Sequence, residues 1–157
     1  MMDFDNTGFA SKYSRLLVTA EQHDGGNMVA NRTEYREWEH FTFEPIDPGR
    51  HIYAIKSRFS NLYVSAFEIQ IIGTHLEMMV ANTNSVSSDA QKFELNVIVP
   101  PAFGEEGTFA LRSIALNKWV AADQVQGGRL NPNRTSIGPW EEFFFHDGSI
   151  SLRPILS

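Results

Sequence analysis

Apolar residues occur in short bursts along this chain, and within the bursts they alternate with other side chains. The alternation is clearest at six positions that form pairs two residues apart: Val18, Ala20, Val64, Ala66, Val120 and Ala122. Because successive side chains of a β-strand point to opposite faces of a sheet, these six are predicted to point into a core. The residues directly before each valine, Leu17, Tyr63 and Trp119, are predicted to lie on the other face, partly exposed or against a loop.

Turn-forming residues separate these bursts. The chain has 7 prolines and 11 glycines, and its Val, Ile, Phe and Thr residues are grouped in short runs. This pattern favours many short strands over helices, so an all-β fold is predicted. The best apolar run, 95–99, is strand-sized and far shorter than the ~20 residues of a membrane helix, so no membrane insertion is expected.

Three stretches of the chain match one another when aligned. Their openings are 11–20, 57–66 and 113–122, in which Ser, Val and Ala columns agree in all three. A second block contains Asn31, Asn82 and Asn133, which are equally spaced 51 residues apart. A third block places Phe41, Phe93 and Phe143 in one column. The chain is therefore predicted to be a single domain of three internal repeats.

Each repeat is predicted to contain four short strands, because a further strand precedes the first block. This strand is clear at 53–56 and 109–112 and weaker at 8–10. The approximate repeats are 1–48, 49–101 and 102–157. The segment 149–154 matches the opening strand a fourth time, and it is predicted to pair near the N-terminus and close the sheet.

Three four-stranded units of this size describe a β-trefoil, and the residues within them resemble the fascin-type trefoil repeat. The third unit carries the resemblance in Lys118-Trp119-Val120-Ala121-Ala122, Gly127-Gly128 and Trp140-Glu141-Glu142-Phe143, and the first in 24–32 and 38–41. The resemblance implies a β-trefoil with three pseudo-equivalent repeats. Because the family includes actin-bundling proteins and the architecture recurs in lectins and carbohydrate-binding modules, it implies either filamentous actin or a glycan as partner.

The net charge of the chain restricts the choice between these partners. The 13 basic and 19 acidic residues give a net charge of −6, which argues against nucleic acid or an anionic membrane surface as the main partner. The same charge weighs against acidic actin filaments and toward a neutral ligand. The absence of cysteine excludes disulfides, thiolate metal sites and cysteine nucleophiles. With no secretory leader at its start, a complete chain is expected to be cytoplasmic, and an extracellular location stays open.

Nothing in the sequence predicts catalysis. It contains no Gly-x-Ser-x-Gly elbow, phosphate-binding loop or dinucleotide fingerprint. Glu39 and Glu141 belong to different repeats, so they are not expected to form a glycosidase pair. The 5 histidines are scattered without the i, i+2 or i, i+4 pairing of a zinc site. No catalytic residue, cofactor or metal site is therefore expected.

Adjacent tryptophan and glutamate residues are the leading candidates for ligand binding. Trp38-Glu39 and Trp140-Glu141 occupy the same place in repeats 1 and 3, where repeat 2 has Ala90 with Gln91. An indole can stack on a pyranose ring while a neighbouring carboxylate accepts hydrogen bonds from its hydroxyls. The alternative is that both residues brace the loop before the fourth strand.

Other polar and aromatic residues extend these candidate sites. They are Asn31, Arg32, Asn133, Arg134 and Trp119. The asparagines suit sugar hydroxyls or turn capping, and the arginines can instead pair with Glu39 and Glu141 to hold the loop. Trp119 is a further stacking platform unless a loop covers it. The sequence thus predicts a non-enzymatic carbohydrate-binding module or small lectin with up to two sugar pockets, with a protein-interaction trefoil as the alternative.

Overall fold

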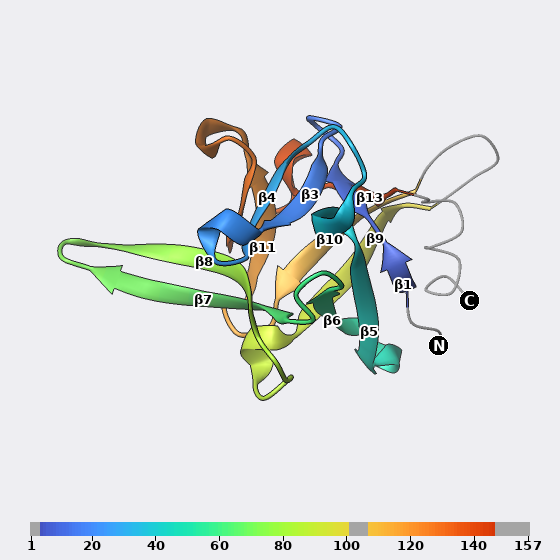
Figure 1. The fold of residues 1–157 in the computed structure, drawn as a ribbon. Helices are drawn as coiled ribbons and strands as arrows, with labels where there is room; N and C mark the ends of the chain where they lie inside the picture. The colour runs from blue at the N-terminus through green and yellow to red at the C-terminus, as the bar shows by residue number, and fades with distance from the viewer. Residues whose placement is uncertain (1–3, 101–106, 147–157) are drawn as a thin grey trace.

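The computed structural model describes residues 4–100 and 107–146, whose regular structure is mostly β-strand (Figure 1). The strands are β1 (Phe4–Thr7), β2 (Phe9–Ser11), β3 (Leu17–Glu21), β4 (Asn27–Arg32), β5 (Phe41–Asp47), β6 (Ile52–Ser57), β7 (Tyr63–Ile71), β8 (Thr74–Thr83), β9 (Phe93–Val99), β10 (Thr108–Ser113), β11 (Lys118–Asp123), β12 (Arg129–Arg134) and β13 (Phe143–Phe145). Short 3-10 helices join them: η1 (Gln22–Asp24), η2 (Glu37–Glu39), η3 (Pro48–Arg50), η4 (Asp89–Gln91), η5 (Gln124–Gln126) and η6 (Pro139–Glu141). Across the described residues, no helix has the length and apolar character needed to span a bilayer.

A closed ring of strands forms the body of the molecule. β1 and β2 are two halves of one strand interrupted at Gly8, and they pair with β5 and β13 respectively. Antiparallel pairs continue the ring from β5 through β6, β9 and β10 to β13. Every position in the ring has two neighbours, so the ring has no free edge. The predicted closing strand at 149–154 lies outside the described residues, and the described part of the ring closes through β13 and β2.

Three hairpins, β3–β4, β7–β8 and β11–β12, contact one another pairwise. The Ala30 N–H donates to the Gly128 carbonyl at 2.8 Å, and the Ala81 N–H donates to the Gly26 carbonyl at 2.9 Å. Pro132 occupies the third equivalent position and has no N–H to donate. The hairpins therefore repeat the predicted 51-residue spacing, but one of their three contacts lacks this hydrogen bond.

The core confirms the predicted inward columns. The six alternating valines and alanines are fully buried, as are the phenylalanines of the predicted column: Val18, Ala20, Val64, Ala66, Val120, Ala122, Phe41, Phe93 and Phe143. On the opposite face Tyr63 and Trp119 are half-buried, as predicted, whereas Leu17 is buried and not partly exposed. Leu17 pairs with Ala10 on β2 and with Arg32 on β4.

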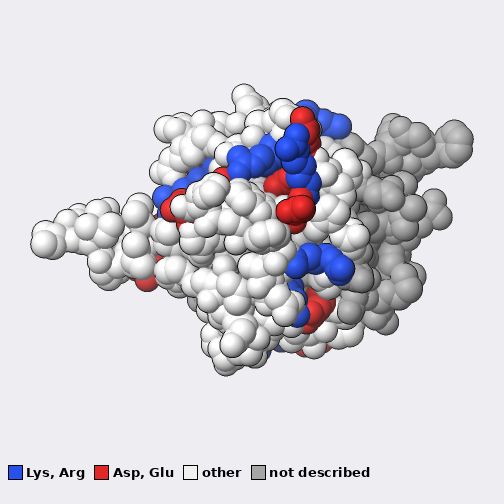
Figure 2. All heavy atoms as spheres, viewed as in Figure 1, with Lys and Arg blue, Asp and Glu red and all other residues white. Residues whose placement is uncertain are grey.

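The β7–β8 hairpin differs from its two counterparts. It is longer than β3–β4 and β11–β12, and it projects from the body as a two-stranded ribbon, drawn in green in Figure 1. Figure 2 shows few charged side chains on this projection, whereas basic and acidic groups intermingle over the face of the body seen in the same view. The ribbon and the body therefore present different surfaces to solvent.

Candidate functional site

The Trp38 side chain lies in η2, in the connection between β4 and β5, and is half-buried. Its indole meets His23 edge-on, with ring centroids 5.2 Å apart, and Phe59 edge-on at 6.0 Å. The Arg32 guanidinium carbon lies 6.0 Å from the indole centroid. Two aromatic neighbours and one cation therefore hold the indole while part of it stays accessible.

Arg32 is oriented by Glu21 rather than by Glu39. The Arg32 Nη2 donates to Glu21 Oε2, and Arg32 Nη1 donates to Asn31 Oδ1 at 3.1 Å. Arg134 likewise donates to Asp123 Oδ2 at 3.2 Å. The two arginines therefore bond the acidic residue that ends the preceding β3 or β11. This differs from the pairing with Glu39 and Glu141 that the sequence left open, because those two carboxylates bond backbone N–H groups instead.

The Glu39 side chain is only 2% exposed and lies beneath its own loop. Its Oε1 accepts the Arg36 backbone N–H at 2.9 Å. In repeat 3, Glu141 Oε1 accepts the Gly138 N–H at 2.5 Å. Both carboxylates are thus engaged with backbone donors, the loop-bracing arrangement that the sequence left open as the alternative.

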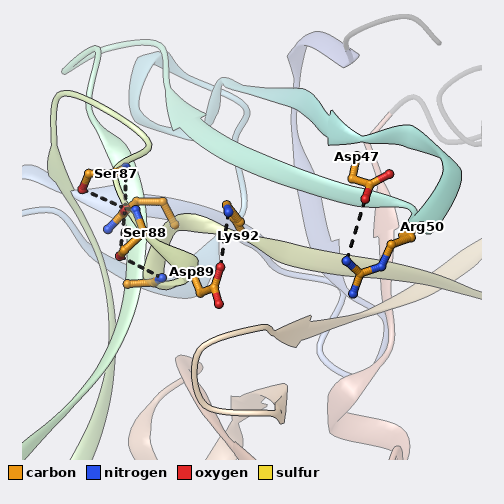
Figure 3. A network of polar contacts seen from close by, with 8 residues as sticks. Asp47, Arg50, Ser87, Ser88, Asp89 and Lys92 are labelled. Carbon is orange, nitrogen blue, oxygen red and sulfur yellow. Dashed lines mark hydrogen bonds and ion pairs between the residues drawn. The ribbon is translucent and has the colours of Figure 1, made fainter.

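Repeat 2 shows the same brace with a different side chain. Gln91 is buried, and its Oε1 accepts the backbone N–H groups of Ser87 and Ser88, each at 3.0 Å (Figure 3). Its Nε2 donates to Ser65 Oγ at 2.9 Å. Repeat 2 has therefore lost the tryptophan but kept an acceptor at the bracing position.

The Trp140 site has the same arrangement of indole and guanidinium groups as the Trp38 site, with different neighbouring residues. Trp140 lies in η6, half-buried, and meets Tyr13 edge-on with centroids 6.2 Å apart. The Arg134 guanidinium carbon lies 5.7 Å from its ring centroid. Asn131 Nδ2 donates to Asp123 Oδ2 at 3.0 Å, so this carboxylate also accepts from a second side chain. The aromatic, guanidinium and carboxylate groups therefore recur in the same order in both repeats.

An open pocket of about 760 Å3 adjoins Trp38. Its lining residues are Arg32, Thr33, Glu34, Arg36, Glu37, Trp38 and Glu39. Arg36 and Glu34 form an exposed ion pair on the rim. Basic and acidic groups are thus mixed around the opening, as on the face shown in Figure 2, so the pocket has no strongly charged wall.

Tyr35 anchors the outer loop of this pocket. Its ring stacks on His40 with centroids 4.0 Å apart, and its hydroxyl donates to the Asn6 carbonyl at 3.3 Å. Burial raises the pKa of Tyr35, partly offset by the nearby Arg58 guanidinium, so the hydroxyl stays protonated near neutral pH. This hydrogen bond therefore fixes the loop to β1.

The remaining predicted residues lie around the two tryptophans to different degrees. Asn31 and Asn133 are exposed, and each accepts a hydrogen bond from the arginine that follows it. Trp119 is half-buried on β11, opposite Arg134 in the strand pairing. The sequence reasoning missed Glu21 and Asp123. Their signal was an acidic residue directly after the Val-x-Ala column in repeats 1 and 3, where repeat 2 has Phe67.

Comparison with solved structures decides the fold. A designed threefold-symmetric protein, ThreeFoil, superposes with a TM-score of 0.66 at 12% identity, covering 88% of this chain and 96% of that one. The BEL β-trefoil superposes with a TM-score of 0.70 at 10% identity, covering 92% of this chain and 94% of that one. The chain has the β-trefoil fold.

A further β-trefoil neighbour is a ricin B-like lectin from Macrolepiota procera, whose structure is a complex with lactose. It has a TM-score of 0.63 and 11% identity and covers 92% of this chain and 96% of that one. No family model and no curated protein matches the chain. The fascin-type resemblance therefore stays a prediction, and the comparisons lend no support to filamentous actin as partner.

Proposed function

We propose that this β-trefoil is a non-enzymatic carbohydrate-binding protein whose principal site is the pocket beside Trp38. The observation that carries the proposal is a half-buried indole that lines an open pocket, flanked by an oriented guanidinium. An indole face stacks on the C–H face of a pyranose, and guanidinium and amide groups bond its hydroxyls. Lectins among the structural neighbours support this use of the fold.

The polar partners of the sugar differ from those expected at first. Glu39 and Glu141 are buried and bonded to backbone N–H groups, so they position the tryptophan loops rather than contact the ligand. Arg32 and Asn31 present the polar groups beside Trp38. Their roles in repeat 3 fall to Arg134 and Asn133.

Charge compensation favours a neutral sugar. Glu21 pairs with Arg32, and Asp123 pairs with Arg134, so each guanidinium already has a carboxylate partner. A partnered guanidinium still has N–H groups to donate to hydroxyls, but its net attraction for an anionic ligand is reduced. A hexose or hexosamine without acidic groups is therefore the proposed ligand class.

The Trp140 site is proposed as a second, weaker site. Its loop has Ser136, Gly138 and Pro139 at the positions of the three charged rim residues of the first site, so it offers fewer charged side chains. Two sites on one body can raise the apparent affinity for a polysaccharide through multivalency. Trp119 is proposed to extend this second site.

The test is a titration of neutral glycans, including β-glucans, chitin oligomers and galactosides, followed by tryptophan fluorescence. Trp38→Ala is expected to weaken binding by about tenfold or more through loss of the stacking surface. Trp140→Ala is expected to cost less for a monosaccharide and more for a polymer. Ile72→Ser, at a fully exposed position on the ribbon, is the matched control and should bind as the wild type does.

Two outcomes would overturn the proposal. One is the absence of a response across the panel; the other is unchanged binding in the Trp38→Ala/Trp140→Ala double variant. Co-sedimentation with filamentous actin at low and physiological salt tests the alternative partner, and the proposal expects the chain to stay in the supernatant.

A further inference from the structure

The projecting β7–β8 ribbon has two chemically different faces. In its register Phe67 faces Met78 and Ile69 faces Leu76, which gives one apolar side. On the other side Glu68 faces Glu77, and Gln70 faces His75. Because side chains alternate along each strand, these four polar residues share one face. None of them belongs to the proposed sugar sites.

Three of these side chains bring potential metal ligands together. One ligand atom each from Glu68, His75 and Glu77 can be chosen so that all lie within 4.8 Å of one another. His75 Nε2 and Glu77 Oε1 are 3.2 Å apart. Two ligands of a tetrahedral zinc ion, bound at their usual distances, are separated by ~3.3 Å. One ligand pair therefore already has the spacing required, and Glu68 needs only a side-chain adjustment to join it.

The charges on this face also favour a cation. Glu68 and Glu77 stand directly opposite each other, and like charges in a cross-strand pair are destabilising. Among residues 4–100 and 107–146, neither carboxylate pairs with a lysine or arginine. Gln70 Nε2 donates to Glu68 Oε1 at 2.6 Å, which leaves the second oxygen of Glu68 for another partner.

From this juxtaposition we propose that Glu68, His75 and Glu77 bind a divalent transition-metal ion, with Zn²⁺ as the best match. One imidazole nitrogen and two carboxylate oxygens are ordinary zinc ligands, and the exposed position of Glu68 and His75 leaves further coordination positions to water. The ion would link β7 to β8 outside the body of the trefoil, where the ribbon is a two-stranded hairpin of marginal intrinsic stability. It would also neutralise the facing glutamates.

The proposed site departs from the expectation of no metal site that was drawn from histidine spacing. His75 and Glu77 are two residues apart on one strand, and Glu68 comes from the neighbouring strand. The third ligand is set by the strand register, which a search for paired histidines does not detect.

The experiment is a calorimetric titration of the full chain with Zn²⁺ alone, in a buffer that does not bind the metal. One ion per chain is expected, with affinity reduced by about tenfold or more in His75→Ala and in Glu77→Gln because each removes a ligand. Asp89→Asn removes an exposed carboxylate elsewhere and should leave the affinity unchanged. Unchanged affinity in His75→Ala, or no binding by the wild type, would overturn the proposal.

Hydrogen exchange gives a second readout. Zn²⁺ should slow amide exchange along Tyr63–Ile71 and Thr74–Thr83, and this protection should be absent in His75→Ala. Equal protection across all strands, or the same protection in the variant, would contradict a local site. Neither experiment contains a glycan, so these results do not depend on the proposed sugar binding.

Discussion

Repeats 1 and 2 have the same internal frame but present different surfaces. Both bury a valine and an alanine on the second strand, and both brace the final loop with a buried side chain, Glu39 or Gln91. Repeat 1 adds Trp38 and its pocket, whereas repeat 2 has Ala90 at that position and extends its hairpin into a ribbon. The comparison separates what maintains the trefoil from what each repeat offers to a ligand.

The largest effect is expected where the repeat 1 hairpin meets repeat 2. Gly26 has φ of +90°, and a Cβ there would lie 2.3 Å from the Ala81 carbonyl oxygen. Gly26→Ala is therefore expected to lower the free energy of unfolding by about 3 kcal/mol, measured by urea denaturation. Gly25→Ala, at φ of +62° with nothing within 4 Å, should cost only about 1 kcal/mol. Equal costs would show that the close approach does not matter.

Removing the brace in repeat 1 is expected to have the next largest effect. Glu39→Ala leaves the Arg36 backbone N–H without its partner and should cost about 2 kcal/mol in the same assay. Glu39→Gln should cost clearly less, because Gln91 performs this role in repeat 2. Glu37→Ala, at an exposed neighbour, controls for the loss of charge. A Gln variant as unstable as the Ala variant would mean that the negative charge itself is required.

Tyr53, in repeat 2, is expected to make the free energy of unfolding depend on pH. Burial raises the pKa of Tyr53 to about 12, against an ordinary value near ~10 in the unfolded chain. Its protonated hydroxyl therefore contributes stability that is fully present below about pH 10 and declines as the pH rises toward 12. Tyr53→Phe, the residue of repeat 3 at Phe109, should flatten this decline in unfolding free energies measured between these values. An identical decline in the variant would assign it to other groups.

The smallest effect is expected at the end of the ribbon. Ile72 is fully exposed, and Ile72→Ser should change the free energy of unfolding by less than about 0.5 kcal/mol. Urea denaturation of this variant beside Gly26→Ala compares the projecting ribbon with the hairpin contact inside the trefoil. A large loss at Ile72 would indicate that the apolar face of the ribbon is covered in solution.

The serine column illustrates what alignment of the repeats could predict. Ser11, Ser57 and Ser113 are all fully buried at the start of matching turns. The carbonyl oxygens of these serines accept the N–H of the residue four positions later: Arg15, Asn61 and Asn117, all of which have positive φ. A repeated residue type with a repeated backbone geometry is visible in sequence because the constraint is local.

The candidate site was predictable only in part. Trp38 and Trp140 were identified from their repetition, but the same alignment suggested that repeat 2 had lost both members of the pair. Gln91 shows that it lost one, since its amide oxygen accepts the Ser88 N–H as the Glu39 carboxylate accepts the Arg36 N–H. Hydrogen-bonding equivalence between different residue types is not apparent from an identity match.

By itself the sequence determined the strand periodicity, the 51-residue repeat and the columns that fill the core, because alternation and turn residues act over a few positions. The tertiary structure decided which side chains pair with one another. It placed Arg32 on Glu21, buried Glu39 beneath its loop, and brought Glu68 opposite Glu77. These pairings depend on the register between strands and on the path of the loops, and they are set only when distant segments pack together.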